Sequence, residues 1–253
     1  MAVTIEVCLG PADYQARAAT GLEDAVCGVL DVLRATSVMV AGLANGAAGF
    51  VPALEISEAL ALRSRHPDAL LAGERNGLRI TAEQSGGVEF DLGNSPREYT
   101  RQRVAGRTLI STTTNGTRAL RTCARARSVV VASFLNLDAT ADWLAQQATE
   151  RIVLVCAGTA ALPAWEDIVG AGALCELLVH RCAGAELLDS AEVARGVYGE
   201  VRGDVRGAIS RSQNGRRLMA NENLRDDVEF CLRRNECELV ALLDVAGVVR
   251  KLR

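Results

Sequence analysis

The sequence predicts an α/β fold of three layers, in which helices cover both faces of a largely parallel or mixed β-sheet. Short apolar runs without polar alternation recur along the chain, as expected for strands that are buried on both faces. Longer helix-like segments separate these runs, and polar loops follow several of them. With 253 residues, 49% of them hydrophobic, the chain is long enough to bury a large core.

The strands are predicted from apolar runs that are rich in β-branched residues, and the helices from apolar residues at helical spacing. Strands are expected at 3–9, 26–30, 49–52, 69–72, 108–110, 129–132 and 152–156. Helices are expected at 35–44, 56–65, 117–125, 139–148 and 166–180. From Asp189 the chain is rich in charges, which predicts surface helices, and short strands are expected around 240–249.

The order of these elements also contains a weak internal repeat. When residues 30–31 are placed over 110–111, both copies run strand, polar loop, helix, strand, helix, strand, polar loop. A generic β–α–β rhythm explains the same pattern, because the identity between the copies is low. We therefore expect a single unit spanning 1–253, with two packed α/β halves at about 1–105 and 106–253 as the alternative.

Composition argues against several classes of function. The net charge of −3 does not favour a nucleic-acid-binding surface. No run of about 18 apolar residues predicts a membrane span, and residues 1–9 lack the pattern of a signal peptide, so a cytoplasmic protein is expected. The eight cysteines form no C-x-x-C pair and several lie in apolar runs, which predicts reduced, buried thiols. A homodimer is expected only from the general frequency of such assemblies.

The stretch STTTNGT, residues 111–117, places hydroxyl groups and an Asn–Gly turn between an apolar strand and a helix. The free N–H groups and positive dipole end of a helix N-terminus suit phosphate or another anion. For this loop alone, capping of the helix by Thr114 or Asn115 is the favoured interpretation. The loop is not a Walker motif, because the chain contains no GxxxxGK[ST] pattern.

Other polar loops add acids and arginine at predicted strand ends. DVLRATS places Asp31 directly after a strand and Arg34 three residues on, and CAGTAALPAWED places Glu166 and Asp167 at the start of a helix. Each feature has a structural explanation, as a weak surface ion pair or as acids that favour the helix dipole. Because ligands of open α/β sheets bind beyond the carboxyl ends of strands, the loops together predict a divalent metal and an anionic substrate.

Five blocks, in this order, resemble the signature of the 2-phosphosulfolactate phosphatase family: DVLRATS, GERNG, FDLGNSP, TTTNGTRAL and CAGT…ED…GAG, over residues 31–172. The resemblance implies an α/β/α architecture particular to that family. It also implies a magnesium-dependent phosphatase that converts 2-phospho-3-sulfolactate to 3-sulfolactate and phosphate, a step of coenzyme M biosynthesis. The chain departs from the family by the insertion LRITAEQSGGVE and by AALPAW at 160–165, which predicts an altered pocket and substrate preference.

For this activity, Asp31 and Glu166 are expected to reach Mg²⁺, with Asp167 and Glu74 as further metal ligands. Asp31, Arg34 and Glu166 are the expected catalytic residues. Arg34 and the loop 112–117 are expected to hold the phosphoryl oxygens, and Arg75 the sulfonate or carboxylate. The full set expected to bind the substrate or its phosphate is Arg75, Asn94, Ser95, Thr112, Thr113, Asn115, Gly116, Thr117 and Thr159.

Alternatives remain at this point. The chain could act on other 2-phospho-hydroxyacids, or bind an anionic metabolite without turnover, and sulfolactate could enter a pathway other than coenzyme M biosynthesis. Attack by Asp31 itself, as in haloacid-dehalogenase-like phosphatases, is disfavoured by Leu33 and by a single lysine, Lys251. Cys175 and Arg181 match a C-x5-R pattern, but the stretch has no glycine and is typical of a helix.

Overall fold

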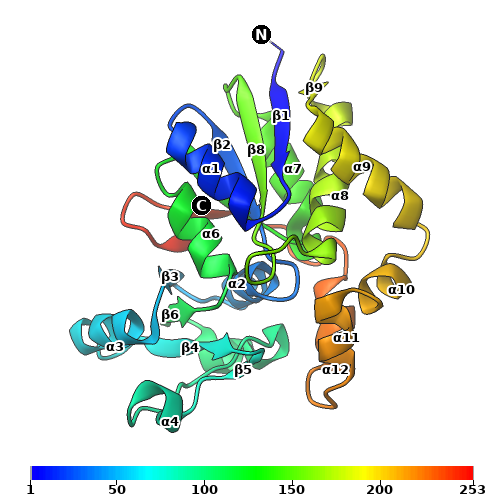
Figure 1. Ribbon diagram of the computed structural model, residues 1–253. Helices are drawn as coiled ribbons and strands as arrows, with labels where there is room; N and C mark the ends of the chain where they lie inside the picture. The colour runs from blue at the N-terminus through cyan, green and yellow to red at the C-terminus, as the bar shows by residue number, and fades with distance from the viewer. Residues whose placement is uncertain (1, 253) are drawn as a thin grey trace.

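The computed structural model describes residues 2–252 and contains a mixed β-sheet of eleven strands within them (Figure 1). The strands are β1 (Thr4–Cys8), β2 (Val26–Leu30), β3 (Gly49–Ala53), β4 (Leu70–Arg75), β5 (Leu78–Arg79), β6 (Thr108–Thr112), β7 (Ser128–Ala132), β8 (Arg151–Cys156), β9 (Glu186–Leu187), β10 (Ala241–Leu243) and β11 (Val249–Lys251). Their order in the sheet is β5-β4-β6-β3-β11-β10-β7-β2-β8-β1-β9.

The sheet contains two parallel blocks joined by an antiparallel hairpin, and β5 pairs antiparallel with β4 at one edge. One block holds β7, β2, β8, β1 and β9, and the other holds β3, β6 and β4. The hairpin β10–β11 lies between them, where β10 pairs with β7 and β11 pairs with β3. In Figure 1 the strands of the two blocks run in clearly different directions. The predicted mixed sheet is confirmed.

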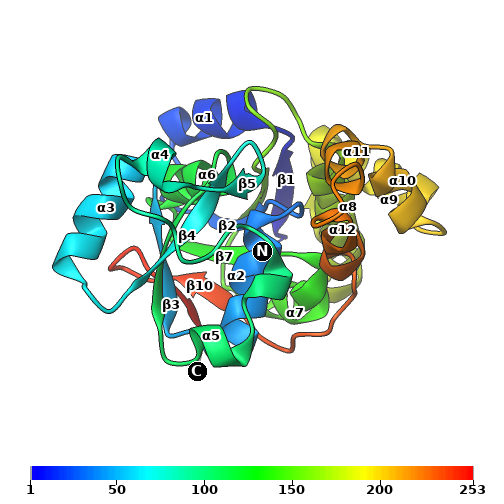
Figure 2. The ribbon, with the colours of Figure 1, turned by 90° about the horizontal axis from the view of Figure 1, so that it is seen from below.

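Helices cover both faces of the sheet, as Figure 2 shows from below. They are α1 (Pro11–Thr20), α2 (Ala35–Ala44), α3 (Ile56–Arg65), α4 (Ala82–Ser85), α5 (Arg101–Val104), α6 (Gly116–Cys123), α7 (Leu137–Ala145), α8 (Trp165–Arg181), α9 (Asp189–Val201), α10 (Val205–Ser210), α11 (Gln213–Met219) and α12 (Arg225–Cys231). Two short 3₁₀ helices span Pro96–Glu98 and Phe134–Asn136.

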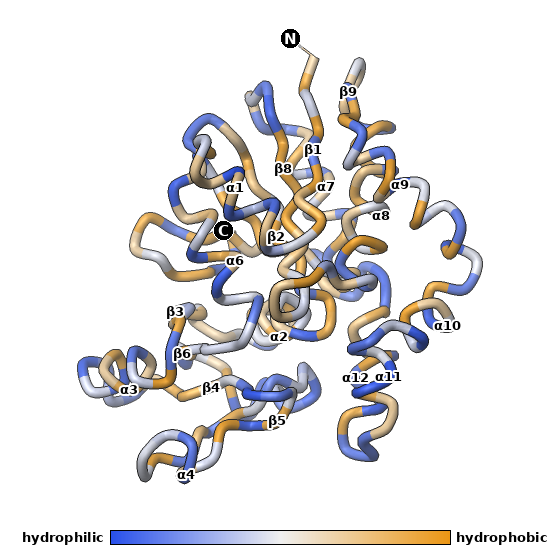
Figure 3. Tube along the Cα trace, viewed as in Figure 1, coloured by the Kyte–Doolittle hydropathy of each residue, from blue (hydrophilic) through white to orange (hydrophobic). Residues whose placement is uncertain are grey.

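The core is divided by the alternation of side chains along the central strands. In β2, Cys27 and Val29 pack with apolar residues of α1, α2 and α6, whereas Val26 and Leu30 pack with α7, α8 and α9 on the opposite face. Figure 3 shows the corresponding apolar strands at the centre. These two-sided contacts explain why the central strands are continuous apolar runs, and they confirm the predicted three layers.

All seven strands predicted before position 160 are present, and so are the five predicted helices, with ends shifted by up to three residues. The predicted charged helices are α9 to α12, and the expected C-terminal strands are β10 and β11. The sequence interpretation missed α1, because this helix buries only Pro11 and Tyr14 and therefore has little apolar periodicity. It also missed the two-residue strands β5 and β9.

Strands from residues 1–105 and 106–253 alternate within the one sheet. β6 pairs with β3 and β4, and β2 pairs with β7 and β8. Across residues 2–252, the helices are too short or too polar to cross a membrane. The eight cysteines are free thiols, and six of them are buried, as predicted.

Candidate functional site

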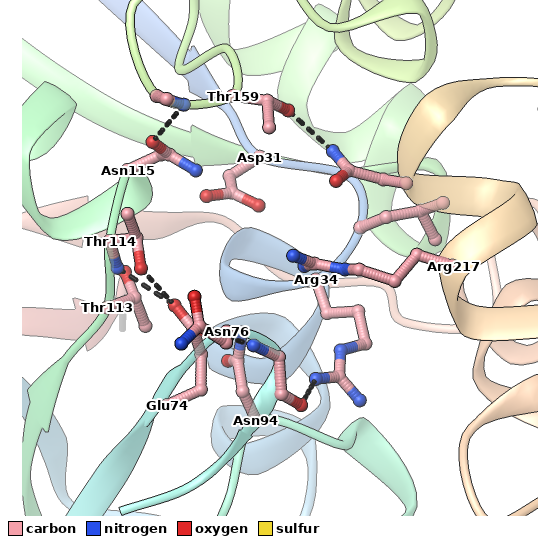
Figure 4. Close-up of a pocket in the computed structure, with 14 residues that line it drawn as sticks. Asp31, Arg34, Glu74, Asn76, Asn94, Thr113, Thr114, Asn115, Thr159 and Arg217 are labelled. Atoms are coloured by element: carbon pink, nitrogen blue, oxygen red, sulfur yellow. Dashed lines mark hydrogen bonds between the residues drawn. The ribbon is translucent and has the colours of Figure 1, made fainter. Parts of the chain in front are cut away.

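A cavity of about 150 Å³ lies beyond the carboxyl ends of β2, β4, β6 and β8, and helix α11 forms one side of it (Figure 4). Its wall carries two carboxylates, two guanidinium groups and four primary amides, so it is built for a polar, charged ligand. The lining residues are Asp31, Leu33, Arg34, Glu74, Asn76, Gly77, Asn94, Thr113, Thr114, Asn115, Thr159, Ala160, Asn214 and Arg217.

Asp31 follows β2 directly and is 7% exposed. Its Oδ1 accepts a hydrogen bond from the backbone N–H of Ala35 at 3.1 Å, and its Oδ2 accepts none from residues 2–252. Burial, together with the negative charges of Glu74 and Glu166, raises the pKa of Asp31 to about 7. A carboxylate with a free oxygen among other acids is a site where a cation stabilises the charged form.

Glu166 and Asp167 open helix α8 behind the cavity wall, and both are buried. Glu166 Oε1 accepts a hydrogen bond from Asn214 Nδ2 at 2.6 Å. The two oxygens of Asp167 accept from the backbone N–H groups of Val32 and Gly158, at 2.8 and 3.0 Å. Burial raises the pKa of Asp167, with the charges of Asp31 and Glu166 adding to it. Asp167 therefore ties the loops after β2 and β8 together.

Glu74, near the end of β4, links the loop after β6 to the turn after β4. Its Oε1 accepts from both the backbone N–H and the hydroxyl of Thr114 at 2.9 Å, and its Oε2 accepts from the N–H of Gly77 at 2.6 Å. Both carboxylate oxygens are thus engaged, and they fix two segments of the cavity wall that come from distant parts of the chain.

The loop before α6 does more than cap its helix. Asn115 is the N-cap residue, but its side chain makes no capping bond and instead accepts from the N–H of Ala160 at 3.0 Å. The Thr114 hydroxyl donates to Glu74. The expectation that Thr114 or Asn115 caps the helix is therefore wrong, because both side chains bind other loops; Thr113 Oγ1 instead accepts from the N–H of Thr117 at 3.2 Å.

This arrangement leaves two backbone hydrogen-bond donors at the start of α6, next to the cavity. Among residues 2–252, the backbone N–H groups of Asn115 and Gly116 find no acceptor, because they lie before the first intrahelical bond of α6. Gly116 also packs closely: a Cβ atom there would lie 2.7 Å from Asp31 Oδ2 and 2.6 Å from the Cβ of Ala35. The start of α6 and the Asp31 carboxylate are therefore in direct contact.

Arg34 is 2% exposed and held from two sides. Its Nη1 donates to Asp227 Oδ2 and its Nη2 to the carbonyl oxygen of Gly77, both at 2.6 Å. Asp227, on α12, is fully buried and also accepts from Ser95 Oγ at 2.6 Å and Arg97 Nε at 2.8 Å. The charge of Arg34 is thus largely offset by Asp227, a residue that the sequence interpretation missed.

Several predicted site residues lie beside the cavity without lining it. Arg75 donates to the carbonyl oxygens of Glu74 and Thr112, at 2.7 and 3.4 Å, and to Thr112 Oγ1 at 3.1 Å. Ser95 binds Asp227, and Thr117 Oγ1 donates to the carbonyl oxygen of Thr113 at 2.9 Å. The cavity does contain the predicted residues Asp31, Arg34, Glu74, Asn94, Thr113, Asn115 and Thr159.

The C-terminal helices supply residues that were not expected at the site. Asn214 and Arg217 of α11 line the cavity, as do Asn76 and Gly77 of the turn after β4. A polar segment, SQNGRR, carries the two helix residues, and its composition alone indicates only a surface helix. The insertion contributes none of the lining residues described; its Ile80 and the adjacent Phe90 are buried in a small core with α3.

The side-chain atoms that could bind a metal at the cavity are carboxylate, amide and hydroxyl oxygens. Across residues 2–252, no three or more His, Cys, Asp or Glu side chains converge to enclose a metal ion by themselves. Asp31 offers a free oxygen at the cavity, and its neighbours Glu74 and Glu166 add negative charge. Such a site fits an ion that takes one or two carboxylates and completes its shell with water and substrate, as Mg²⁺ does.

The cysteine considered as a nucleophile, Cys175, and the only lysine, Lys251, do not line the cavity. Cys175 lies inside α8, where burial raises its pKa to about 12, and Arg181 pairs with Asp138 and Asp142. The C-x5-R match is therefore coincidental, because the thiol is buried and protonated. Lys251 lies on β11 and is not among the residues that line the cavity.

Comparison with known proteins gives a consistent result. The family described as 2-phosphosulpholactate phosphatase matches residues 14–245. A probable 2-phosphosulfolactate phosphatase of Thermotoga petrophila is 40% identical over 203 residues, 80% of this chain and 82% of that protein. The corresponding protein of Clostridium acetobutylicum is 37% identical over 213 residues, 84% and 86% of the two chains. That of Caldicellulosiruptor saccharolyticus is 34% identical over 223 residues, 87% and 89%.

Proposed function

The chain belongs to the 2-phosphosulfolactate phosphatase family, which are phosphoric monoester hydrolases, and we propose that it hydrolyses 2-phospho-3-sulfolactate to 3-sulfolactate and phosphate. The observation that supports this most directly is the cavity of about 150 Å³, in which two arginines and Asp31 lie beside the start of α6 and its free backbone N–H groups. Its small volume favours a short phosphorylated acid over a nucleotide.

The start of α6 is the proposed site for the phosphoryl group. The N–H groups of Asn115 and Gly116 can donate to phosphoryl oxygens, and the N-terminal end of the helix dipole favours their negative charge. Arg34 adds a guanidinium group that Asp227 and Gly77 hold in place. Donors that are fixed before the substrate arrives stabilise the charge of the transition state without reorganisation.

The charges of the cavity support a bound Mg²⁺ as part of the proposal. Asp31 and Glu74 on the wall balance Arg34 and Arg217, and Asp227 offsets Arg34 again, so the protein alone does not neutralise a substrate with three acidic groups. Asp31 would hold the ion through Oδ2, and the carboxylates of Glu74 and Glu166 add negative charge around it. When bound, the ion would supply charge neutralisation and an activated water.

We also propose that the protein acts in the cytoplasm. Its reaction belongs to sulfolactate metabolism, for which coenzyme M biosynthesis is the route that the resemblance implies. A function in other 2-phospho-hydroxyacid pathways keeps the same chemistry and differs only in the substrate.

The test is phosphate release from 2-phosphosulfolactate, 2-phospholactate and phosphoglycolate, each with Mg²⁺ and with excess chelator. We expect release that chelator abolishes and that is fastest with 2-phosphosulfolactate. Faster release from another member of the panel would overturn the substrate, and release that persists in chelator would overturn the metal. A folded protein that releases no phosphate from any member would overturn the enzymatic proposal.

A further inference from the structure

We propose that Arg217 binds the sulfonate group of the substrate and thereby distinguishes it from phosphorylated hydroxyacids that lack a sulfonate. This inference rests on the proposed function, and it assigns the recognition of the sulfonate to a residue of helix α11. It also replaces Arg75 in that role, because the Arg75 guanidinium donates to Glu74 and Thr112 and does not line the cavity.

Helix α11 is capped at its own start, and the side chain of Asn214 holds it against the cavity. Ser212 caps the helix by accepting from the N–H of Gly215 at 3.0 Å. Asn214 Nδ2 donates to Thr159 Oγ1 and to Glu166 Oε1, both at 2.6 Å. The helix is short, but its position is set by a buried amide that contacts the loop after β8 and the start of α8.

Arg217 follows Asn214 by three residues and therefore lies on the same face of the helix. Figure 4 shows its side chain directed into the cavity. Its guanidinium packs over the turn after β4, where a Cβ atom added at Gly77 would lie 3.2 Å from Nη2. In the part of the chain that the structure describes, Arg217 makes no ion pair or hydrogen bond, whereas the other lining arginine, Arg34, is paired with Asp227.

The position of Arg217 matches the position of the sulfonate in the substrate. Figure 4 shows Arg217 and the loop of Thr113 and Thr114 on opposite sides of the cavity, with Asp31 between them. In 2-phosphosulfolactate the phosphate and the carboxylate share one carbon, whereas the sulfonate is carried by an additional methylene. With the phosphate at the start of α6, the sulfonate is the acidic group that the extra methylene allows to lie furthest from it, on the side of α11.

The chemistry of the two groups is also complementary. A sulfonate is ionised at every physiological pH and presents three acceptor oxygens, and a guanidinium group presents a planar fork of donors that binds such an anion at two points. Because Arg217 has no competing carboxylate partner among the described residues, it can bind an incoming anion without first breaking an ion pair.

The experiment compares KM for 2-phosphosulfolactate and 2-phospholactate in the wild type, Arg217→Gln, Arg217→Lys and Arg216→Gln. The last is the matched control, because Arg216 is exposed on the same helix, donates to the carbonyl oxygen of Arg211 and does not line the cavity. With Arg217→Gln, KM for 2-phosphosulfolactate should rise roughly 10- to 100-fold and KM for 2-phospholactate by less than about 2-fold. Arg217→Lys should be intermediate, and Arg216→Gln unchanged.

An equal rise for both substrates would overturn the inference, because Arg217 would then bind a group that both contain. So would an unchanged KM for 2-phosphosulfolactate. If the wild type hydrolyses neither substrate, the proposed function fails, and calorimetric binding of 3-sulfolactate and lactate tests Arg217 separately. Tighter binding of 3-sulfolactate that is lost in Arg217→Gln would support the inference, and any other pattern would overturn it.

Discussion

Replacing Asp227 with asparagine is expected to lower the free energy of unfolding by about 3–5 kcal/mol. Asp227 is fully buried and accepts hydrogen bonds from Arg34 and Ser95 at 2.6 Å and from Arg97 at 2.8 Å. Asparagine preserves the shape but removes the charge that offsets Arg34, which is 2% exposed. The cost is large because an unpaired guanidinium group would remain in a site that water barely reaches.

Urea denaturation at neutral pH measures this effect, and Asp226→Asn is the matched control. Asp226 precedes Asp227 on the same helix, is 67% exposed and contacts Arg97 at 3.3 Å, so its replacement should cost less than about 1 kcal/mol. Turnover of Asp227→Asn should also fall, because Arg34 lines the cavity. Equal stability losses in the two variants would refute the view that Asp227 compensates a buried charge.

Three further results are expected. In chelator, the free energy of unfolding should fall as the pH rises from 3.8 to about 7, because burial raises the pKa of Asp31 from 3.8 to about 7. The stabilisation is complete below 3.8, where the unfolded chain also binds this proton. It is lost as the pH rises through about 7, where Asp31 of the folded protein ionises. Thermal unfolding from pH 4 to 9 checks this, and an equally steep profile for Asp31→Asn would contradict it. Gly116→Ala should remove most phosphate release, since its Cβ would lie 2.7 Å from Asp31 Oδ2, and it should lower the free energy of unfolding in urea by about 1–3 kcal/mol. Gly199→Ala is the control: a Cβ there would meet no atom within 4 Å, so this variant should be as stable as the wild type or more stable. Lys251→Gln should leave the rate of phosphate release unchanged, because Lys251 lies on β11 and does not line the cavity; a large loss would reopen a lysine-assisted mechanism.

The central strands were predictable because their physical constraint is local. Each is buried on both faces, so its residues are apolar regardless of which helix covers it. Asp31 and Thr113 were predictable for a related reason: they follow strands β2 and β6, and the ends of parallel strands are where an α/β sheet places its ligands. The short edge strands have two residues each and leave no such pattern.

The orientation of neighbouring side chains was not predictable in the same way. Glu74 lines the cavity, whereas Arg75 donates to Thr112 instead. Likewise Thr113 lines the cavity and Thr112 does not. Successive residues of an extended chain point to opposite sides, so a motif that names both members of a pair identifies the loop but not which side chain faces the ligand.

The residues supplied by the C-terminal helices depend on contacts across most of the chain. Asp227 meets Arg34 across 193 positions, and Asn214 meets Glu166 across 48. Helices with several exposed charges give no local indication that one aspartate is fully buried or that one arginine faces a cavity. Only the packing of α11 and α12 against the 3₁₀ helix Pro96–Glu98, the loops at the strand ends and the start of α8 determines this.

The hairpin β10–β11 has a consequence for the precision of the enzyme. Asp31 belongs to one parallel block, whereas Glu74 and the loop after β6 belong to the other, and the hairpin joins the blocks by pairing with β7 on one side and β3 on the other. A displacement of about 1 Å at a reacting centre can reduce a rate on the order of 100-fold. Val249 pairs with Phe50 and does not line the cavity, so a strand of three residues outside the pocket helps to keep the two halves of the pocket aligned.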